Sequence, residues 1–226
     1  MTLKDNLVIS RNSSHLASQL SSAIIDLAIA SINLRGRFNI ILTGGNSVIE
    51  TYKKLQLSQS DWDNWHLYLS DERYLPEDDQ DRNDLSIYSS WLQGCSFPKS
   101  NVHFMNTKFG LSRAASLYEK TLIDADYFDL ALLSMGEDGH IASLFPNRSY
   151  DDEKKVIIER NSPKYPRERI SINYRTLNSS RNIFKVISGM SKKKAFNKFI
   201  NGSSLPINKI FNNAEKVFVT SDLMTD

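Results

Sequence analysis

An acid and a histidine stand two residues apart in the stretch Gly136–His140, which reads GEDGH. At that spacing the carboxylate of Asp138 can accept a hydrogen bond from one ring nitrogen of His140 and so fix the tautomer of the ring. The other nitrogen can then act as a general base near neutral pH. The same spacing also fits a structural role, in which Asp138 caps the start of a helix that contains His140.

The residues around this pair predict where it stands in the fold. Leu130–Leu133 is an apolar run typical of a strand that is buried on both faces of a parallel sheet. Gly136 and Gly139 allow a sharp turn after that strand, and Ile141–Leu144 can begin a helix. We therefore expect the acid and the imidazole at the carboxyl end of a central strand, where open α/β sheets bind ligands.

Paired glycines follow another predicted strand in the segment Leu42–Ser47, which reads LTGGNS. Such a turn leaves backbone N–H groups without partners at a helix N-terminus, where they can bind phosphate with the hydroxyls of Thr43 and Ser47. Strand–glycine–helix turns also serve purely structural needs, and this segment alone does not decide between the two. It lacks the lysine of a P-loop and the third glycine of a dinucleotide fingerprint, which argues against ATP and NAD.

Charged residues follow two further predicted strands. Asp71, Glu72 and Arg73 come after WHLYLS, and an arginine there can hold a phosphate with two N–H groups or neutralise an anion. A solvated loop is the alternative, because DERYLPEDDQDRND has neither helical nor strand periodicity. Lys192–Lys194 falls at the start of a predicted helix, where cations are unfavourable unless an anion binds or the lysines point into solvent.

Together these groups favour acid–base chemistry on a phosphorylated small molecule. His15, His66 and His103 fall within predicted elements, so we interpret them as structural or surface residues. No serine occupies a G-x-S-x-G elbow and Cys95 is the only cysteine, so no acyl-enzyme, internal disulfide or cysteine zinc cluster is expected. No second His or Cys lies at ligand spacing from His140, so no metal site is expected either.

The composition bears on the class of partner and on the compartment. The chain has 226 residues with 28 Lys and Arg against 26 Asp and Glu, and a net charge of +2 argues against nucleic acid as a partner. The amino terminus is too polar for a signal peptide, and no run of eighteen apolar residues indicates a membrane span. We therefore expect a cytoplasmic protein, built as one domain over residues 1–226.

Short apolar strands alternate with amphipathic segments along the chain, which predicts an α/β fold with a mostly parallel sheet flanked by helices. Five helices are expected. The first begins at residue 13, the second follows the paired glycines, the third and fourth span 85–92 and 111–123, and the fifth follows Gly189. The expected strands are 6–10, 38–43, 65–70, 101–105, 128–134, two pieces within 155–173, 182–188 and 216–221.

Taken in order, the motifs of the chain resemble those of the 6-phosphogluconolactonases. The resemblance covers nearly the whole chain and rests on LTGGNSVIETYKKL, LYLSDERYLP followed by DRND, FDLALLSMGEDGHIASLFP, PRERISI and ISGMSKKKAF. It implies a Rossmann-like three-layer α/β sandwich, shared with glucosamine-6-phosphate deaminases and ribose-5-phosphate isomerases. It also implies hydrolysis of 6-phospho-D-glucono-1,5-lactone to 6-phosphogluconate in the pentose phosphate pathway, with no metal or organic cofactor.

The resemblance also implies a role for each candidate residue. His140 would take a proton from the attacking water and return it to the departing ring oxygen, while Asp138 orients the ring. Asp71 and Glu72 would shape the floor of the site. The pocket for the phosphorylated sugar lactone would be lined by Gly44, Gly45, Asn46 and Ser47, and the phosphate and oxyanion charges would be held by Arg73, Arg169 and Lys192.

The chain departs from the family pattern at a few places. Asn46–Val48 replaces Ser-Thr-Pro after the glycines, Arg169–Ser171 replaces Arg-x-Thr, and the last segment is shorter than in many members. The lost proline is a helix-start preference and the serine keeps a hydroxyl, so we expect activity to survive these changes.

Other functions are compatible with parts of the pattern. The deaminases of the same fold group continue GEDGHIA with Phe-Asn-Glu-Pro and use that Glu in catalysis, whereas Phe145 stands there in this chain and cannot exchange protons. A sugar-phosphate-sensing domain of a regulator would need a DNA-binding module, for which the chain has no room before its first strand. An inactive relative would be expected to lose His140 or Asp138.

We also expect a monomer, because no apolar helix is left over once the sheet is covered.

Overall fold

The computed structural model describes residues 6–225, so the amino-terminal stretch whose polarity argues against a signal peptide lies partly outside it. Its strands are β1 (Leu7–Ser10), β2 (Phe38–Leu42), β3 (Trp65–Leu69), β4 (Asp71–Arg73), β5 (Val102–His103), β6 (Leu130–Ser134), β7 (Val156–Glu159), β8 (Arg169–Ile172), β9 (Asn182–Ile187) and β10 (Glu215–Thr220). Its α-helices are α1 (Ser13–Arg35), α2 (Asn46–Gln56), α3 (Asn83–Ser90), α4 (Leu111–Asp124), α5 (Tyr174–Asn178) and α6 (Lys193–Ile200).

The main sheet of the described chain has seven strands in the order β1-β10-β9-β6-β2-β3-β5, and every neighbouring pair is parallel. This confirms the predicted α/β fold. The strand order turns around between β6 and β2, because the chain adds β3 and β5 on one side of this pair and β9 and β10 on the other. Such a switch point leaves a crevice at the carboxyl ends of the two strands.

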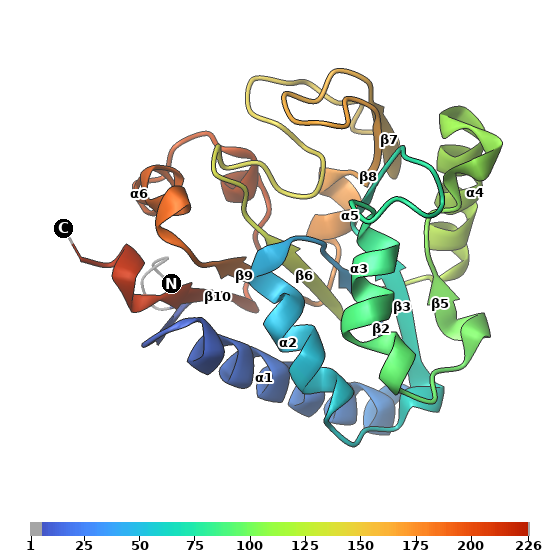
Figure 1. Ribbon diagram of the computed structural model, residues 1–226, viewed down its shortest axis with the longest axis horizontal. Helices are drawn as coiled ribbons and strands as arrows, with labels where there is room; N and C mark the ends of the chain where they lie inside the picture. The colour runs from blue at the N-terminus through green and yellow to red at the C-terminus, as the bar shows by residue number, and fades with distance from the viewer. Residues whose placement is uncertain (1–5, 226) are drawn as a thin grey trace.

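The sequence of β6 explains why helices cover both faces of the sheet. Leu130, Ala131, Leu132 and Leu133 are all 0% exposed, so side chains that alternate between the two faces are equally buried. On one face α2 packs between α1 and α3, as Figure 1 shows. The fully buried run therefore anchors the centre of the fold and fixes the position of the turn that follows it.

Helix α1 is long and apolar enough to cross a membrane by the criteria of length and composition alone. In this fold its apolar stripe faces the protein, because Leu16, Leu20, Ile24 and Ala28 recur at helical spacing and are at most 1% exposed. The helix packs along α2 and against β1, β2 and β10 (Figure 1).

A smaller sheet of three strands, in the order β4-β8-β7, lies beside the main one and is antiparallel. Its strands β7 and β8 are the two β-rich pieces expected within residues 155–173. The prediction that Asp71–Arg73 belongs to a loop was wrong, because β4 pairs with β8. Its hydrogen-bond partner comes from almost one hundred residues further along the chain, so local periodicity carried no sign of it.

The helix expected to begin at Ile141–Leu144 was also wrong. The chain there forms a tight turn with isolated bridges between Met135 and Ile141 and between Ile141 and Leu144, and Ala142 has φ of 50°. Burial of both Ile141 and Leu144 satisfies the apolar pattern without a helix. Asp138 therefore has no helix to cap, which removes the role of helix N-cap that its spacing also allowed.

Candidate active site

A cavity of about 300 Å³ lies where β2 and β6 end, at the switch point of the main sheet. Its walls come from the segment after β2, from β4, from the turn after β6, from the connection between β7 and β8, and from the start of α6. Nearly all the residues named from the sequence line it, namely Gly44, Gly45, Asn46, Ser47, Asp71, Arg73, His140, Arg169 and Lys192. Asp138 and Glu72 lie behind this lining.

Asp138 and His140 make the contact that their spacing predicts. Nδ1 of His140 lies 2.5 Å from Oδ1 of Asp138, and the same oxygen accepts the backbone N–H of His140 at 3.2 Å. Burial alone would raise the pKa of Asp138, but the hydrogen bond and the charge of His140 outweigh it and lower the pKa to about 2. An ionised Asp138 accepts a hydrogen bond from Nδ1–H, so the lone pair of the neutral ring is on Nε2.

The imidazole is held by packing on two sides as well as by the carboxylate. The ring of Phe145 lies 4.8 Å from the ring of His140 between centroids. A Cβ on Gly136 would stand 2.0 Å from Cε1 of His140, so only a glycine leaves room for the ring in this position. The side chain of His140 is 15% exposed, and the exposed part opens on the cavity.

The start of α2 forms the opposite wall. Gly45 is the N-cap with φ of 95°, and no side chain caps this end of the helix. The first backbone N–H groups of a helix have no partner within it, and the helix dipole favours an anion there. Gly44 brings the chain close to α3, since a Cβ there would stand 1.9 Å from Oδ1 of Asn83. This wall can therefore receive a phosphate or another anion.

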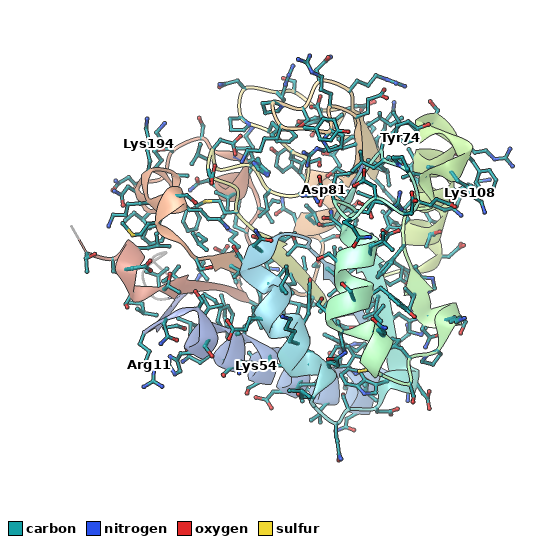
Figure 2. All side chains as sticks on the ribbon, viewed as in Figure 1. Arg11, Lys54, Tyr74, Asp81, Lys108 and Lys194 are labelled. Carbon is teal, nitrogen blue, oxygen red and sulfur yellow. The ribbon has the colours of Figure 1, made fainter. Side chains whose placement is uncertain are left out.

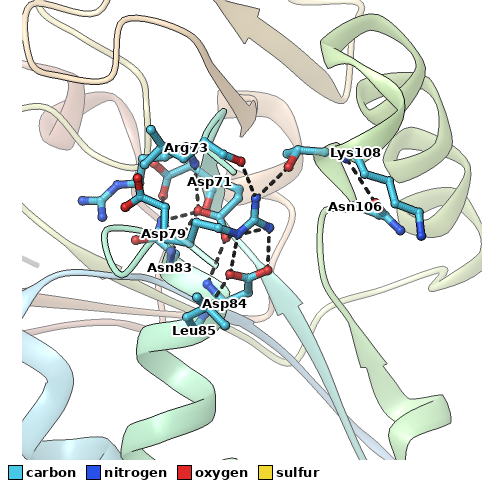
Figure 3. A network of polar contacts seen from close by, with 12 residues as sticks. Asp71, Arg73, Asp79, Asn83, Asp84, Leu85, Asn106 and Lys108 are labelled. Carbon is cyan, nitrogen blue, oxygen red and sulfur yellow. Dashed lines mark hydrogen bonds and ion pairs between the residues drawn. The ribbon is translucent and has the colours of Figure 1, made fainter. Parts of the chain in front are cut away.

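Asp71 forms the floor of the cavity and is only 5% exposed. Its Oδ2 accepts the hydroxyl of Ser143 at 2.6 Å, and its Oδ1 accepts the hydroxyl of Ser70 at 3.1 Å. Asn83 donates to the backbone carbonyl of Asp71 at 2.8 Å. The carboxylate is thus held by two hydroxyl groups, and Figure 3 shows Asn83 of α3 close to Asp71.

Glu72 points away from the cavity and is fully buried. Its carboxylate accepts the backbone N–H groups of Arg73, Asn83 and Asp84 at 2.8–2.9 Å, and Nη2 of Arg82 lies 3.9 Å away. Burial and the nearby Asp84 raise the pKa of Glu72 to about 7, although the three backbone N–H groups oppose this. The geometry supports a positioning role, in which Glu72 ties the start of α3 to β4.

Arg73, Lys192 and Arg169 bring positive charge to the cavity in different ways. Nε of Arg73 is buried and has no hydrogen-bond partner among the described residues, while its Nη1 donates to the carbonyl of Asp81. Nζ of Lys192 lies 2.6 Å from Oγ of Ser47, at the start of α2. Arg169 is 4% exposed and donates hydrogen bonds to the backbone carbonyls of residues 164, 165 and 166.

The other two lysines of the Lys192–Lys194 cluster do not line the cavity. Lys193 donates to the carbonyls of Leu223 and Thr225 and so holds the last described residues against α6. Lys194 points outward from α6, as Figure 2 shows. Three cations at one helix start were predicted to be unfavourable. Only Lys192 faces the cavity there, because Lys193 contacts the carboxyl-terminal segment and Lys194 points into solvent.

Several lining residues were not named as candidates from the sequence: Asn83, Glu137, Lys164, Ser188 and Ser191. Asn83 belongs to the DRND motif of the family resemblance, and that motif could have identified it as a site residue. Lys164 lies between two prolines in the connection from β7 to β8, and nothing in the local pattern indicates that this connection reaches the end of β6. Ser143 was also missed, although it holds the Asp71 carboxylate.

The remaining histidines and acids do not form a second site. His66 and His103 contact each other, with Nδ1 3.1 Å from Nε2, and neither lines the cavity. Across residues 6–225, no group of three or more His, Cys, Asp and Glu side chains is arranged to hold a metal ion.

The chain is similar to several known proteins. The family model of glucosamine-6-phosphate isomerases/6-phosphogluconolactonase matches residues 11–219. A chloroplastic 6-phosphogluconolactonase 3 of Arabidopsis thaliana is 34% identical over 213 residues, which are 85% of this chain and 62% of that protein. The 6-phosphogluconolactonase of Mycobacterium leprae is 37% identical over 196 residues, which are 80% of this chain and 76% of that one.

The fold has a close structural counterpart as well. The crystal structure of 6-phosphogluconolactonase from Thermotoga maritima superposes with a TM-score of 0.88 at 26% identity and covers 95% of this chain and 98% of that one. The residues that match the family model include every segment that lines the cavity. The chain belongs to the family of glucosamine-6-phosphate isomerases and 6-phosphogluconolactonases.

Proposed function

We propose that this protein hydrolyses 6-phospho-D-glucono-1,5-lactone to 6-phospho-D-gluconate, as a step of the oxidative pentose phosphate pathway. The single observation that carries the proposal is the contact between Asp138 and His140 at the edge of a cavity whose other walls hold cations and a helix start. The names of the relatives from Arabidopsis thaliana and Mycobacterium leprae support the same reaction.

In this mechanism Nε2 of His140 takes a proton from a water molecule as the water oxygen attacks the lactone carbonyl. The tetrahedral intermediate then collapses, the bond from the carbonyl carbon to the ring oxygen breaks, and the imidazolium gives its proton to that oxygen. Asp138 keeps Nδ1 protonated and stabilises the imidazolium that forms between the two steps. Proton donor and acceptor are the same nitrogen, so one side chain is enough for both steps.

The substrate phosphate is assigned to the start of α2 and to the surrounding cations. Gly44, Gly45, Asn46 and Ser47 would supply backbone N–H groups and a hydroxyl, and Lys192 an ammonium group. Arg73, whose Nε has no partner in the described chain, is suited to an oxyanion or a phosphate oxygen. Arg169 adds positive charge behind them, and Asp71 and Glu72 hold the floor in place.

The alternative within the same family is deamination or isomerisation of an amino sugar phosphate. The position of Phe145 argues for the lactonase, because its ring packs on His140 and offers no group that could move a proton.

We also propose that the protein works as a monomer of one domain in the cytoplasm. It needs no metal or organic cofactor, and it binds neither nucleic acid nor a membrane.

The test is an assay in which glucose 6-phosphate and its dehydrogenase generate the lactone in place. The wild-type protein should accelerate lactone disappearance over the spontaneous rate, and His140→Ala should lose about 10²- to 10⁴-fold of that acceleration. His15→Ala, in α1 and away from the cavity, is the matched control and should behave as wild type. Turnover of glucosamine 6-phosphate in place of the lactone would contradict the proposal.

A further inference from the structure

A second lysine reaches the cavity from the smaller sheet. Lys164 lies in the connection between β7 and β8, and its Nζ is 3.6 Å from Oε2 of Glu137. Glu137 belongs to the turn after β6, one residue before Asp138. The pair therefore links the smaller sheet to the turn that carries His140, and both side chains line the cavity.

The backbone of Lys164 is fixed while its side chain is not. Arg169 donates to the carbonyls of Lys164, Tyr165 and Pro166 at 3.0–3.3 Å. The hydroxyl of Ser162 donates to the carbonyl of Lys164 and accepts its N–H. The side chain is 43% exposed, so its ammonium group can change partner without any movement of the chain beneath it. A buried arginine thus fixes the backbone that carries an exposed cation at the edge of the cavity.

Glu137 stands among positive groups on the side of the cavity where α2 begins. A hydrogen bond from Ser191 and the charges of Lys164 and Lys192 lower the pKa of Glu137. Lys192 in turn contacts Ser47 at the second position of α2. The carboxylate of Glu137 therefore pairs with Lys164 at 3.6 Å and is subject to the charge of Lys192, which contacts the helix start suited to a phosphate.

The bond between Lys164 and Glu137 is weak enough to be exchanged. Their side chains are 43% and 57% exposed, and pairs of this kind contribute little to stability. A phosphate monoester carries a charge of about −1.5 to −2 near neutral pH and offers three acceptor oxygens, against the single charge of a carboxylate. The same carboxylate repels a phosphate that binds beside Lys192.

We propose that Lys164 binds the substrate phosphate together with Lys192, and that Glu137 is the internal carboxylate which the phosphate replaces as the partner of Lys164. Lys164 is then a substrate-binding residue, and Glu137 sets the affinity for the phosphate by competing with it. Arg169 acts through Lys164 as a positioning residue. This inference rests on the proposed lactonase function and specifies how the same site selects a phosphorylated substrate.

The experiment compares Lys164→Gln and Glu137→Gln with two matched controls. Arg160 and Glu168 form an exposed pair on the same connection, with Nη1 3.0 Å from Oε1, and neither lines the cavity. Arg160→Gln and Glu168→Gln therefore make the same changes of charge outside the site. For each variant, kcat and KM are measured with 6-phosphogluconolactone and with unphosphorylated glucono-1,5-lactone, and the affinity for inorganic phosphate is measured by calorimetry.

Lys164→Gln should raise KM for the phosphorylated lactone about tenfold and weaken phosphate binding by a similar factor, with kcat little changed. Lys164→Arg should restore most of the affinity, because the guanidinium keeps the charge. Glu137→Gln should lower KM and tighten phosphate binding by up to about fivefold. None of these changes should alter KM for the unphosphorylated lactone, and the two control variants should match wild type.

Two results would overturn the inference. Wild-type affinity of Lys164→Gln for both the phosphorylated lactone and inorganic phosphate would remove Lys164 from the site. A rise in KM for Glu137→Gln equal to that for Lys164→Gln would mean that Glu137 positions the lysine and does not compete with the phosphate. If wild type fails to hydrolyse any lactone, the proposed function fails, and the calorimetric series still decides whether Lys164 and Glu137 act on phosphate as described.

Discussion

The imidazole of His140 packs directly against the backbone of Gly136. It occupies the space that the Cβ of any other residue at position 136 would need. That Cβ would stand 2.0 Å from Cε1, 2.2 Å from Nδ1 and 2.7 Å from Nε2 of the ring. The glycine is therefore a steric requirement of the histidine to which the proposed mechanism assigns the proton transfer. Its backbone φ is not in the left-handed region, so an alanine there would meet only the ring and not a backbone strain.

Gly136→Ala should consequently lower kcat while it leaves substrate binding nearly intact. The ring must move by about 1 Å or more to avoid the methyl group, and a displacement of that size can cost about 10²-fold in rate. KM for the phosphorylated lactone should stay within about threefold of wild type, because the cations and α2 are on other elements. Steady-state kinetics on a variant with a native circular dichroism spectrum make the measurement. A rise in KM as large as the fall in kcat would indicate general damage to the site.

Asp138→Asn should reduce kcat by about three orders of magnitude or more and leave the fold intact. The amide can donate to Nδ1, which places the ring proton on Nε2 and removes the base, as the Asp-to-Asn change does in serine proteases. Because the pKa of Asp138 is about 2, the wild-type carboxylate stays ionised throughout the neutral range. Nitrogen-15 chemical shifts of the ring report the tautomer directly. A variant with the wild-type tautomer and wild-type kcat would remove Asp138 from the mechanism.

Lys192 should make substrate binding depend on pH near pH 8. Burial lowers the pKa of its ammonium group to about 8, with Lys164 adding to that shift and Glu137 opposing it. The lysine is therefore a cation below about pH 8 and becomes neutral above it, so affinity for the phosphorylated product should fall as the pH rises through this value. Calorimetric titration with 6-phosphogluconate at pH 7 and pH 9 measures the change. Lys192→Arg should bind with little difference between the two values, since a guanidinium does not titrate there.

Glu72→Gln should destabilise the protein by about 2–3 kcal/mol. Both carboxylate oxygens accept backbone N–H groups, and an amide would turn an NH₂ group towards at least one of these donors and leave it unsatisfied. For a chain of this length the loss corresponds to a fall in Tm of about 5–10 °C. Thermal unfolding is compared with that of Glu168→Gln, an exposed acid for which no change is expected. Equal Tm values for wild type and Glu72→Gln would show that the network does not hold the start of α3.

The main strands along the chain and the position of the histidine after one of them could be predicted from the sequence, because both depend on local signals. The order of those strands within the sheet was not predicted, because it depends on pairing between distant segments. Leu130–Leu133 is apolar at every position, so it had to be a strand with both faces covered, and the glycines after it marked the turn. The contact of Asp138 with His140 follows from a spacing of two residues. Burial, periodicity and turn preference act over a few residues, and a single sequence displays them.

The smaller sheet and the residues it brings to the cavity could not be predicted in this way. The pairing of Asp71–Arg73 with Arg169–Ile172 depends on a partner far along the chain, and a strand of three residues has no periodicity to read. Lys164 lines the cavity from the connection that leads into β8, and its own neighbours in the sequence give no sign of that. The false helix at Ile141–Leu144 has a similar origin, since an apolar pattern shows that residues are buried and does not show by which backbone conformation.

The ladder between β4 and β8 also decides how the site can move. β4 starts two residues after β3 ends, and Asp71 lies opposite Ser171 while Arg73 lies opposite Arg169. Swinging the β7–β8 hairpin away would break this ladder at about 1 kcal/mol for each hydrogen bond, and would pull on the floor of the cavity as well. With the hairpin held in place, the exchange of the Lys164 ammonium group between Glu137 and a phosphate needs rotation of side chains only. Exposed side chains rearrange in roughly picoseconds to nanoseconds, against microseconds to milliseconds for a hinged domain, so this exchange is too fast to limit turnover.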